Sequence, residues 1–345
     1  MQQQEEIENL KKHLTQFLKT ENFSVEPLYG GASVRRYYTL NFYDHTYFPN
    51  SRVILMHIPE DYLEMADDFL NISFYFKRHQ IAHPRVYEIY RKSGWIFLEP
   101  AAGEQLDLYL KAHPEEIIDI YSRLLDFLVN LQNRALPEIN CPAFRRHFDK
   151  EKYLFEFRFH VEEQLINTYW GYRFPEDEQK LFGRFSQEVS SYLHSQANFF
   201  VHRDFQSSNI FYAPDGSDSF FQVIDFQDAR SGGMVYDLVS MVWDSYVDIP
   251  PELRTQLVEQ FFRKQPAVAR HLNEEQYWQT VDYTIIQRKL HDAGAFAYNY
   301  NRTGKHFFLQ YLNPAVRMAL SVMEKYPKFG EMAGIFEKLL QEHAG

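Results

Sequence analysis

The chain has 345 residues, which is enough to bury a large core and to divide into two lobes or domains. Its formal net charge of -11 argues against nucleic acid and anionic membranes as partners, and no obligate protein partner is inferred. Cys141 is the single cysteine, which excludes an intramolecular disulfide and a cysteine-rich zinc site and fits a reducing, cytoplasmic location. No segment has the roughly 18 uninterrupted apolar residues of a membrane span, and the N-terminal residues show no secretory signal.

Residues 1–100 predict an opening helix followed by a small antiparallel sheet with one helix packed on it. EPLYGGASVRRYYTLNFY has a glycine pair followed by alternating apolar and polar residues, and SRVILMHI is rich in strand-forming residues. A helix is expected from about Glu60 to His79. Two further strands are expected at Arg85 to Tyr90 and Trp95 to Leu98, on either side of the turn-like RKSG.

Residues 104–345 are predicted to form a mainly helical second lobe, because their apolar residues recur at helical spacing. The segment EPAAGE indicates the linker, with a hinge near 98–103. Long helical runs fill Glu151 to Leu193 and Pro251 to the end, and HFDKEKYLFEFRFHVEE is interpreted as a charged helix with a solvated face. The expected fold class is therefore α+β, with a small sheet lobe before a helical lobe.

One β-rich interruption, NIFYAPDGSDSFFQVIDFQDAR, stands between the helical blocks. Its two apolar runs, Ile210 to Tyr212 and Phe220 to Ile224, flank turn residues and therefore predict a hairpin. A hairpin would bring Asn209 close to Asp225, with Asp204 in the loop that leads in. Two carboxylates and a carboxamide offer the hard oxygen ligands that Mg²⁺ prefers beside a phosphate-bearing substrate.

The stretch VHRDFQSSN has the spacing H-R-D-x-x-x-x-N of the protein-kinase catalytic loop. The downstream strand ends Val-Ile-Asp-Phe-Gln, with Gln227 where protein kinases have glycine. This pattern assigns Asp204 as the catalytic base that accepts a substrate hydroxyl proton, and Asn209 and Asp225 as metal ligands. A polar turn between a helix and a strand is the alternative for the stretch taken alone.

Three further polar residues near this loop are interpreted as structural. His202 is expected to hydrogen-bond to backbone around the loop, and Asp237 to anchor the loop from the start of a buried helix. Asp228 caps a helix or lies near the metals, and the structural interpretation is favoured.

The sequence resembles the aminoglycoside phosphotransferase family, small-molecule kinases with a two-lobed protein-kinase-like fold. The resemblance rests on GGASVRRYYTL, VHRDFQSSN, VIDFQDAR followed by YDLVS, and IIQRKLHDAGAFAY, and it extends over nearly the whole chain. More narrowly, the chain looks like bacterial cell-wall recycling kinases that phosphorylate N-acetylmuramate and N-acetylglucosamine at the anomeric hydroxyl. The resemblance implies ATP and Mg²⁺ as cofactors and a small amino sugar as the acceptor.

The resemblance also implies a nucleotide site at Gly30, Gly31 and Ser33 of the phosphate loop. Protein kinases place a lysine on the strand after this loop, but SRVILMHI has none, so Arg35 or Arg36 is the candidate for the phosphate charge. Surface arginines on a strand are the alternative. Adenine is expected to meet the backbone at residues 98–100, which places Glu99 in the nucleotide site.

The acceptor site is implied by resemblance at Asp244, Gln287 and Arg288, with Arg288 or Lys289 available for a lactyl carboxylate; a solvated helix face is the alternative. The sugar kinases tend to carry other residues at the positions of Gly31, Gln206 and Ser208, which leaves the sugar open. A kinase of an aminoglycoside, choline or an amino alcohol is the second hypothesis. A pseudokinase that binds nucleotide without turnover is the third, and the absent strand lysine is its main support.

Overall fold

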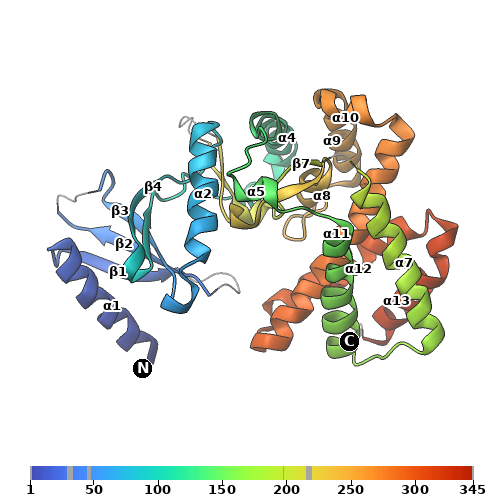
Figure 1. The fold of residues 1–345 in the computed structure, drawn as a ribbon, viewed down its shortest axis with the longest axis horizontal. Helices are drawn as coiled ribbons and strands as arrows, with labels where there is room; N and C mark the ends of the chain where they lie inside the picture. Colours follow the sequence, from blue (N-terminus) through green and yellow to red (C-terminus); the bar gives the residue numbers. More distant parts are fainter. Residues whose placement is uncertain (1, 29–33, 45–47, 197, 215–219, 344–345) are drawn as a thin grey trace. The chain divides into compact units, whose positions relative to one another are not determined.

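The computed structural model describes residues 2–28, 34–44, 48–196, 198–214 and 220–343. The chain divides into two compact units, whose elements are labelled in Figure 1. Unit 1 comprises Met1–Glu104 and Phe211–Gln227, and unit 2 comprises Gln105–Ile210 and Asp228–Gly345. The first crossing between units follows the predicted hinge at 98–103. The grouping of 211–227 with unit 1 is a feature that the sequence pattern does not indicate.

Unit 1 is built on a five-stranded antiparallel sheet with the strand order β1-β2-β3-β5-β4. In chain order the elements of this part are α1 (Gln2–Leu18), β1 (Phe23–Leu28), β2 (Arg36–Phe42), β3 (Arg52–His57), η1 (Glu60–Tyr62), α2 (Met65–Arg78), β4 (Val86–Tyr90), η2 (Arg91–Ser93) and β5 (Trp95–Leu98). Alternation along the strands gives the sheet two faces. Leu40 and Leu55 lie on the face whose core also contains Leu10 and Leu14 of α1.

The predicted elements of the first lobe agree with the structure except near Glu60. The predicted helix begins as the short 3₁₀ turn η1, and the α-helix proper starts at Met65. The expected turn RKSG is observed as η2 followed by Gly94, whose φ of 63° is left-handed. A Cβ at Gly94 would lie 1.9 Å from the Ile58 carbonyl oxygen, so this turn requires glycine.

The strands of the predicted hairpin, β8 (Ile210–Tyr212) and β9 (Phe221–Val223), are hydrogen-bonded neighbours in a three-stranded sheet with the order β6-β8-β9. The third strand, β6, is the two-residue segment Glu104–Gln105. The predicted turn residues 215–219 lie outside the described part of the chain. The two strands of the hairpin are therefore confirmed as neighbours.

Unit 2 is mainly helical. Its α-helices are α3 (Leu106–Ala112), α4 (Ile117–Arg134), α5 (Pro142–Arg145), α6 (Lys150–Glu156), α7 (Glu176–His194), α8 (Tyr236–Val242), α9 (Pro251–Lys264), α10 (Pro266–His271), α11 (Glu274–Thr303), α12 (Leu309–Met323) and α13 (Gly330–Glu342). The element η4 (Phe157–Tyr169) is a π-helix, and the short 3₁₀ helices are η3 (Pro114–Glu116), η5 (Ser207–Asn209), η7 (His306–Phe308) and η8 (Pro327–Phe329). A further 3₁₀ helix, η6 (Phe226–Asp228), spans a unit boundary. Strands β7 (Asn198–Val201) and β10 (Arg230–Gly233) pair antiparallel. The α+β fold class is thereby confirmed.

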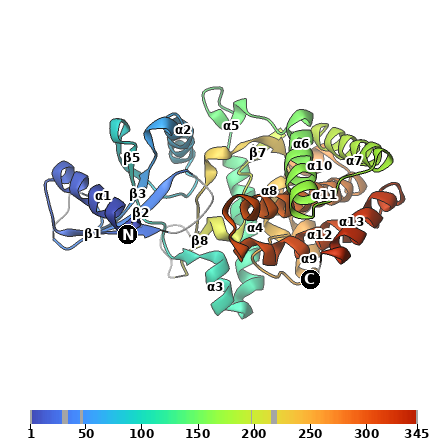
Figure 2. The same ribbon diagram turned by 90° about the horizontal axis from the view of Figure 1, so that it is seen from below.

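The long helix α11 forms the centre of unit 2, where it contacts α12, η4, α8 and α7 (Figure 2). A capping box formed by Asn273 and Gln276 starts α11, and Gly304 in the left-handed conformation ends it. Most residues from Thr280 to Ala297 are buried. Among the described residues, α11 and its neighbours are too polar or too short to span a bilayer.

The charged segment after Phe148 is helical and exposes residues such as Glu151 and Arg158, as the sequence pattern indicated, but one of its charged groups is buried. Its carboxylate Glu156 has no exposed surface, and the chain continues from α6 directly into the π-helix η4. π-helices are rare and often mark functional sites. The packing of η4 on α11 is close, because a Cβ at Gly294 would lie 2.2 Å from the His160 carbonyl oxygen.

We predict that Gly294→Ala lowers the free energy of unfolding by about 1–3 kcal/mol, because the added methyl group forces the two helices apart. Gly334→Ala in α13 is the matched control: its Cβ would meet no atom within 4 Å. Alanine should stabilise that helix by up to about 1 kcal/mol. Urea unfolding of both variants measures the difference, and equal stabilities would contradict the close packing.

Candidate active site

The loop after β7 is held by a buried carboxylate. Asp237, in the first turn of α8, accepts hydrogen bonds from the backbone N–H groups of His202 (2.7 Å) and Arg203 (3.0 Å). Burial raises the pKa of Asp237 to about 7, against the opposing effect of these two donors. The predicted anchoring role of Asp237 is confirmed. His202 has no exposed surface, which agrees with a structural role.

A second carboxylate holds the other end of the loop. Asp244 accepts from the backbone N–H of Ser207 (2.6 Å) and of Tyr246 (2.8 Å), and it is almost fully buried. Both of its oxygens thus have backbone donors, which favours a positioning role over contact with an acceptor. The amide nitrogen of Asn209 donates to the Asp204 carbonyl (3.0 Å), so its oxygen is the atom available to a metal ion.

Arg203 is strained and enclosed by acidic groups. Its φ of 83° is left-handed, a conformation that costs a non-glycine residue about 1–3 kcal/mol and is typical of functional sites. Its Nη1 lies 3.6 Å from Asp228 Oδ2, a contact that was not predicted but that favours the structural interpretation of Asp228. Burial opposes the charge of Arg203, but Asp204 and Glu156 raise its pKa overall.

The proposed base, Asp204, faces a buried guanidinium. Its Oδ1 lies 3.1 Å from Nη2 of Arg288, and its side chain is 24% exposed, so a ligand can still reach it. Burial would raise the pKa of Asp204, but Arg203 and Arg288 together lower it. Asp204 is therefore ionised at neutral pH and can accept a hydroxyl proton.

The α11 cations have distinct positions. Arg288 Nε lies 3.2 Å from Asp292 Oδ1, and its Nη1 lies 3.3 Å from the Tyr236 hydroxyl. Lys289 donates to Asp292 (2.7 Å), Ser245 Oγ (2.6 Å) and a backbone carbonyl (2.9 Å), which uses all three ammonium donors. Arg288, and not Lys289, therefore remains the candidate for an acceptor carboxylate.

The two arginines that were candidates for the phosphate charge, Arg35 directly before β2 and Arg36 at its first residue, differ in exposure and in partners. Arg36 is exposed and pairs with Glu6 of α1. Arg35 is 8% exposed, and its Nη2 lies 3.9 Å from Oδ1 of Asp225, both within unit 1. The predicted metal ligand and Arg35 are thus brought together, which favours Arg35 for phosphate contact.

Asp225 is fixed by its neighbours. It has a left-handed φ of 61°, and Gln227 Nε2 donates to its Oδ1 at 2.7 Å. The next residue, Phe226, stacks on Phe69 of α2 with ring centroids 5.0 Å apart and also packs on Phe76 at 4.9 Å. Strain at Asp225 is therefore compensated by ring packing within unit 1.

The hydrogen bonds that Glu99 already makes limit which backbone groups could take part in the predicted adenine contact. The Glu99 N–H already donates to the Arg85 carbonyl at 2.8 Å, and the Glu99 carboxylate pairs with the Arg85 side chain at 2.6 Å. Pro100 has no N–H. The Glu99 carbonyl is thus the group there that could accept from adenine. Gly30, Gly31 and Ser33 lie outside the described residues.

The sequence interpretation missed Asp292 and Glu156. Asp292 stands four residues after Arg288 and three after Lys289, a helical spacing that brings opposite charges together and could have indicated the pairing. Glu156 has Lys152 four residues before it, but its partner Gln287 lies on a distant segment that helical spacing does not reveal. Gln287 Nε2 donates to Glu156 Oε2 at 2.8 Å.

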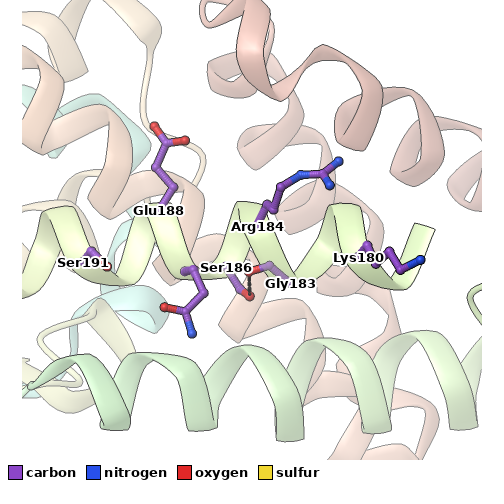
Figure 3. Close-up of a pocket in the computed structure, with 7 residues that line it drawn as sticks. Lys180, Gly183, Arg184, Ser186, Glu188 and Ser191 are labelled. Carbon is purple, nitrogen blue, oxygen red and sulfur yellow. Dashed lines mark hydrogen bonds between the residues drawn. The ribbon is translucent and has the colours of Figure 1, made fainter. Parts of the chain in front are cut away.

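A surface hollow of about 730 Å³ lies along α7, and none of its lining residues belongs to the catalytic loop (Figure 3). Its lining residues are Lys180, Gly183, Arg184, Ser186, Gln187, Glu188 and Ser191. Ser186 Oγ donates to the Gly183 carbonyl, and Glu188 pairs with Lys328. No predicted site residue lines it, so we assign it no part of the chemistry.

The fold and the loop define a phosphotransferase. The profile of the phosphotransferase enzyme family matches residues 24–272, well over half of the chain. The chain belongs to this family and is a small-molecule kinase.

Two relatives are named N-acetylmuramate/N-acetylglucosamine kinase. The protein from Neisseria meningitidis serogroup B is 24% identical, over 94% of this chain and 95% of the relative. The protein from Pseudomonas putida is 23% identical, over 91% and 87%. Among solved structures, the aminoglycoside phosphotransferase APH(2'')-Ib with bound ADP has a TM-score of 0.60 at 14% identity, covering 90% of this chain and 97% of that one. Choline kinase from Cryptosporidium parvum has a TM-score of 0.59 at 12% identity, covering 95% and 97%. These structures share the fold.

If Arg35 contacts the nucleotide phosphates, Arg35→Ala should weaken ATP binding about tenfold or more and leave adenosine binding nearly unchanged, because only ATP loses a charge-assisted contact. Arg36→Ala is the matched control and should affect neither ligand. Calorimetric titration of both ligands into both variants measures this. Equal losses for ATP and adenosine in Arg35→Ala would indicate structural damage instead.

Proposed function

We propose that the protein transfers the γ-phosphoryl group of ATP, in the presence of Mg²⁺, to the anomeric C1 hydroxyl of an N-acetylated amino sugar. N-acetylglucosamine and N-acetylmuramate are the first candidates, because the relatives similar over most of the chain carry those names. The single cysteine and the use of ATP fit a cytoplasmic enzyme.

Asp204 supplies the chemistry on the acceptor side. An ionised carboxylate can orient a hydroxyl and accept its proton as the hydroxyl oxygen bonds to the γ-phosphorus and the bond to ADP breaks. The anomeric hydroxyl is more acidic than other sugar hydroxyls, so a carboxylate with a lowered pKa is a sufficient base for it. The loop that carries Asp204 is fixed at both ends by Asp237 and Asp244, which favours positioning as the main contribution.

Within unit 1, the nucleotide is assigned to Arg35, Asp225 and the Glu99 carbonyl, and the catalytic-loop spacing assigns Asn209 as a further metal ligand. Each of these two residues offers the hard oxygen that Mg²⁺ prefers: the Asn209 amide nitrogen donates to the Asp204 carbonyl and leaves its oxygen available, and Asp225 has a half-exposed carboxylate. A bound Mg²⁺ would neutralise phosphate charge. Arg35 would add a cation on the same side as Asp225.

The contact of Arg288 with Asp204 is the observation that carries the choice of acceptor class. A guanidinium 3.1 Å from the base partly neutralises the Asp204 carboxylate and so weakens its attraction for an ammonium group, which would also meet the positive charge of Arg288. A neutral sugar avoids that repulsion, and an acidic sugar would be attracted. The contact therefore favours an amino sugar with an acetylated nitrogen over choline, an amino alcohol or an aminoglycoside.

Asp204→Asn should keep the fold and the affinity for ATP but lower kcat at least about 100-fold, because the amide cannot accept the proton. Asp126→Asn, on the exposed face of α4, is the control and should keep wild-type kcat. Steady-state kinetics and nucleotide titration check both variants. A near wild-type kcat for Asp204→Asn would remove Asp204 from the base role.

The acceptor itself is tested by ³¹P NMR of the product. Incubation with ATP, Mg²⁺ and N-acetylglucosamine or N-acetylmuramate should give the sugar 1-phosphate, and an analogue without the C1 hydroxyl should be inert. Phosphate at C6 would contradict the anomeric assignment. Turnover of choline or ethanolamine, and of no sugar, would contradict the assignment of a sugar acceptor but not the assignment as a kinase.

A further inference from the structure

Glu156 is a fully buried carboxylate at the last residue of α6, directly before η4. A buried charge is tolerated only when it is paired and hydrogen-bonded. Its Oε1 lies 3.3 Å from Lys152 Nζ and 4.0 Å from His291 Nε2. Burial would raise the pKa of Glu156, but the positive groups near it, His291 first, lower it to about 2. The contact with Lys152 and the lowered pKa together keep Glu156 ionised at neutral pH.

An ionised Glu156 determines the orientation of Gln287. A carboxylate can only accept, so the atom of Gln287 that lies 2.8 Å from Glu156 Oε2 must be the amide nitrogen. The amide oxygen of Gln287 then points away from Glu156. This oxygen is buried and has no hydrogen-bond partner within the described part of the chain. An unmet buried acceptor is unfavourable, which indicates that a donor from a ligand or water completes it.

The surroundings of Glu156 include the catalytic loop. The charge of Glu156 acts on Arg203, and the charge of His291 acts on Asp204, so these groups lie within electrostatic reach of each other. Arg288, next to Gln287 on α11, contacts Asp204 directly. The unmet Gln287 oxygen therefore belongs to the same polar region of unit 2 as the proposed base.

The π-helix η4 packs against α11 beside these groups. His160 of η4 packs on His291 of α11, with ring centroids 4.4 Å apart. Neither ring nitrogen of His291 makes a hydrogen bond of ordinary length within the described residues. The close approach at Gly294 fixes the distance between the two helices. Several buried polar atoms without a hydrogen-bond partner among the described residues thus lie near the contact between η4 and α11.

We propose that Glu156 is a positioning residue for acceptor recognition: it holds the Gln287 amide so that Oε1 accepts a hydrogen bond from a hydroxyl or amide N–H of the acceptor. The inference rests on the proposed function, since it assumes a phosphoryl acceptor bound beside Asp204. Glu156 does not touch the acceptor itself. A neutral, hydrogen-bond-donating acceptor such as an acetylated amino sugar satisfies the Gln287 oxygen.

The test measures KM for the acceptor in Glu156→Gln. A glutamine at 156 can donate as well as accept, so Gln287 loses its fixed orientation and the acceptor loses about one hydrogen bond. The acceptor KM should rise about tenfold, while KM for ATP stays unchanged. Glu151→Gln, on the exposed side of α6, is the matched control and should have wild-type constants.

A second variant keeps the test independent of the stability of Glu156→Gln. Gln287→Met conserves volume and removes only the amide, so it should raise the acceptor KM by a similar factor. The double variant should be no worse than Gln287→Met alone, because Glu156 acts only through Gln287. If Glu156→Gln does not fold, Gln287→Met decides. An acceptor KM within twofold of wild type in Gln287→Met, or additive effects in the double variant, would overturn the proposal.

The acceptor used is the best substrate of the wild-type protein among N-acetylglucosamine, N-acetylmuramate, glucosamine, choline and ethanolamine. Failure of the sugar assignment would appear as wild-type preference for an amine. Failure of the Glu156 inference would appear as unchanged KM ratios on whichever acceptor is preferred. The two failures are therefore distinguishable.

Discussion

The hydrogen bonds from Asp237 to the catalytic loop are the interaction on which the proposed chemistry depends. Arg203 has a left-handed backbone conformation that no isolated chain would hold, and Asp237 binds its N–H together with that of His202. Because α8 is buried throughout, Asp237 cannot move away. The strain at Arg203 is thus compensated by a rigid partner, and Asp204, the next residue, is presented in one orientation.

Once the loop is fixed, the charges around it must balance. Arg288 is buried and Arg203 is partly buried, and each has acidic partners: Asp228 for Arg203, Asp292 and Asp204 for Arg288. Such pairs add little net stability, because desolvation offsets their attraction, but they fix geometry. The consequence for function is that the base lies in a prearranged field, so that a bound hydroxyl need not wait for side chains to reorganise.

Much of this arrangement could be predicted from the sequence, and the reason is that it is local. The spacing of Asp204 and Asn209 and the strand ending at Asp225 follow from the order of residues along the chain, as do the two faces of β2. Which of Arg35 and Arg36 faces Asp225 could not be predicted, because the register of β2 depends on pairing with β3. Glu156 could not be found either, because its partner Gln287 lies on a helix far along the chain.

The missing strand lysine need not mean lost activity. Tyr37 and Met56 are paired in register between β2 and β3, and Arg35 directly precedes β2. Burial raises the pKa of Tyr37 to about 12, with Arg35 and Asp225 both acting on it, so all three groups share one neighbourhood. Because arginine is longer and binds phosphate through two nitrogens, Arg35 can supply, from the position before β2, the charge that a lysine on β3 supplies in protein kinases. The absence of lysine from SRVILMHI is thus compatible with a working kinase, and the argument for a pseudokinase loses its main support.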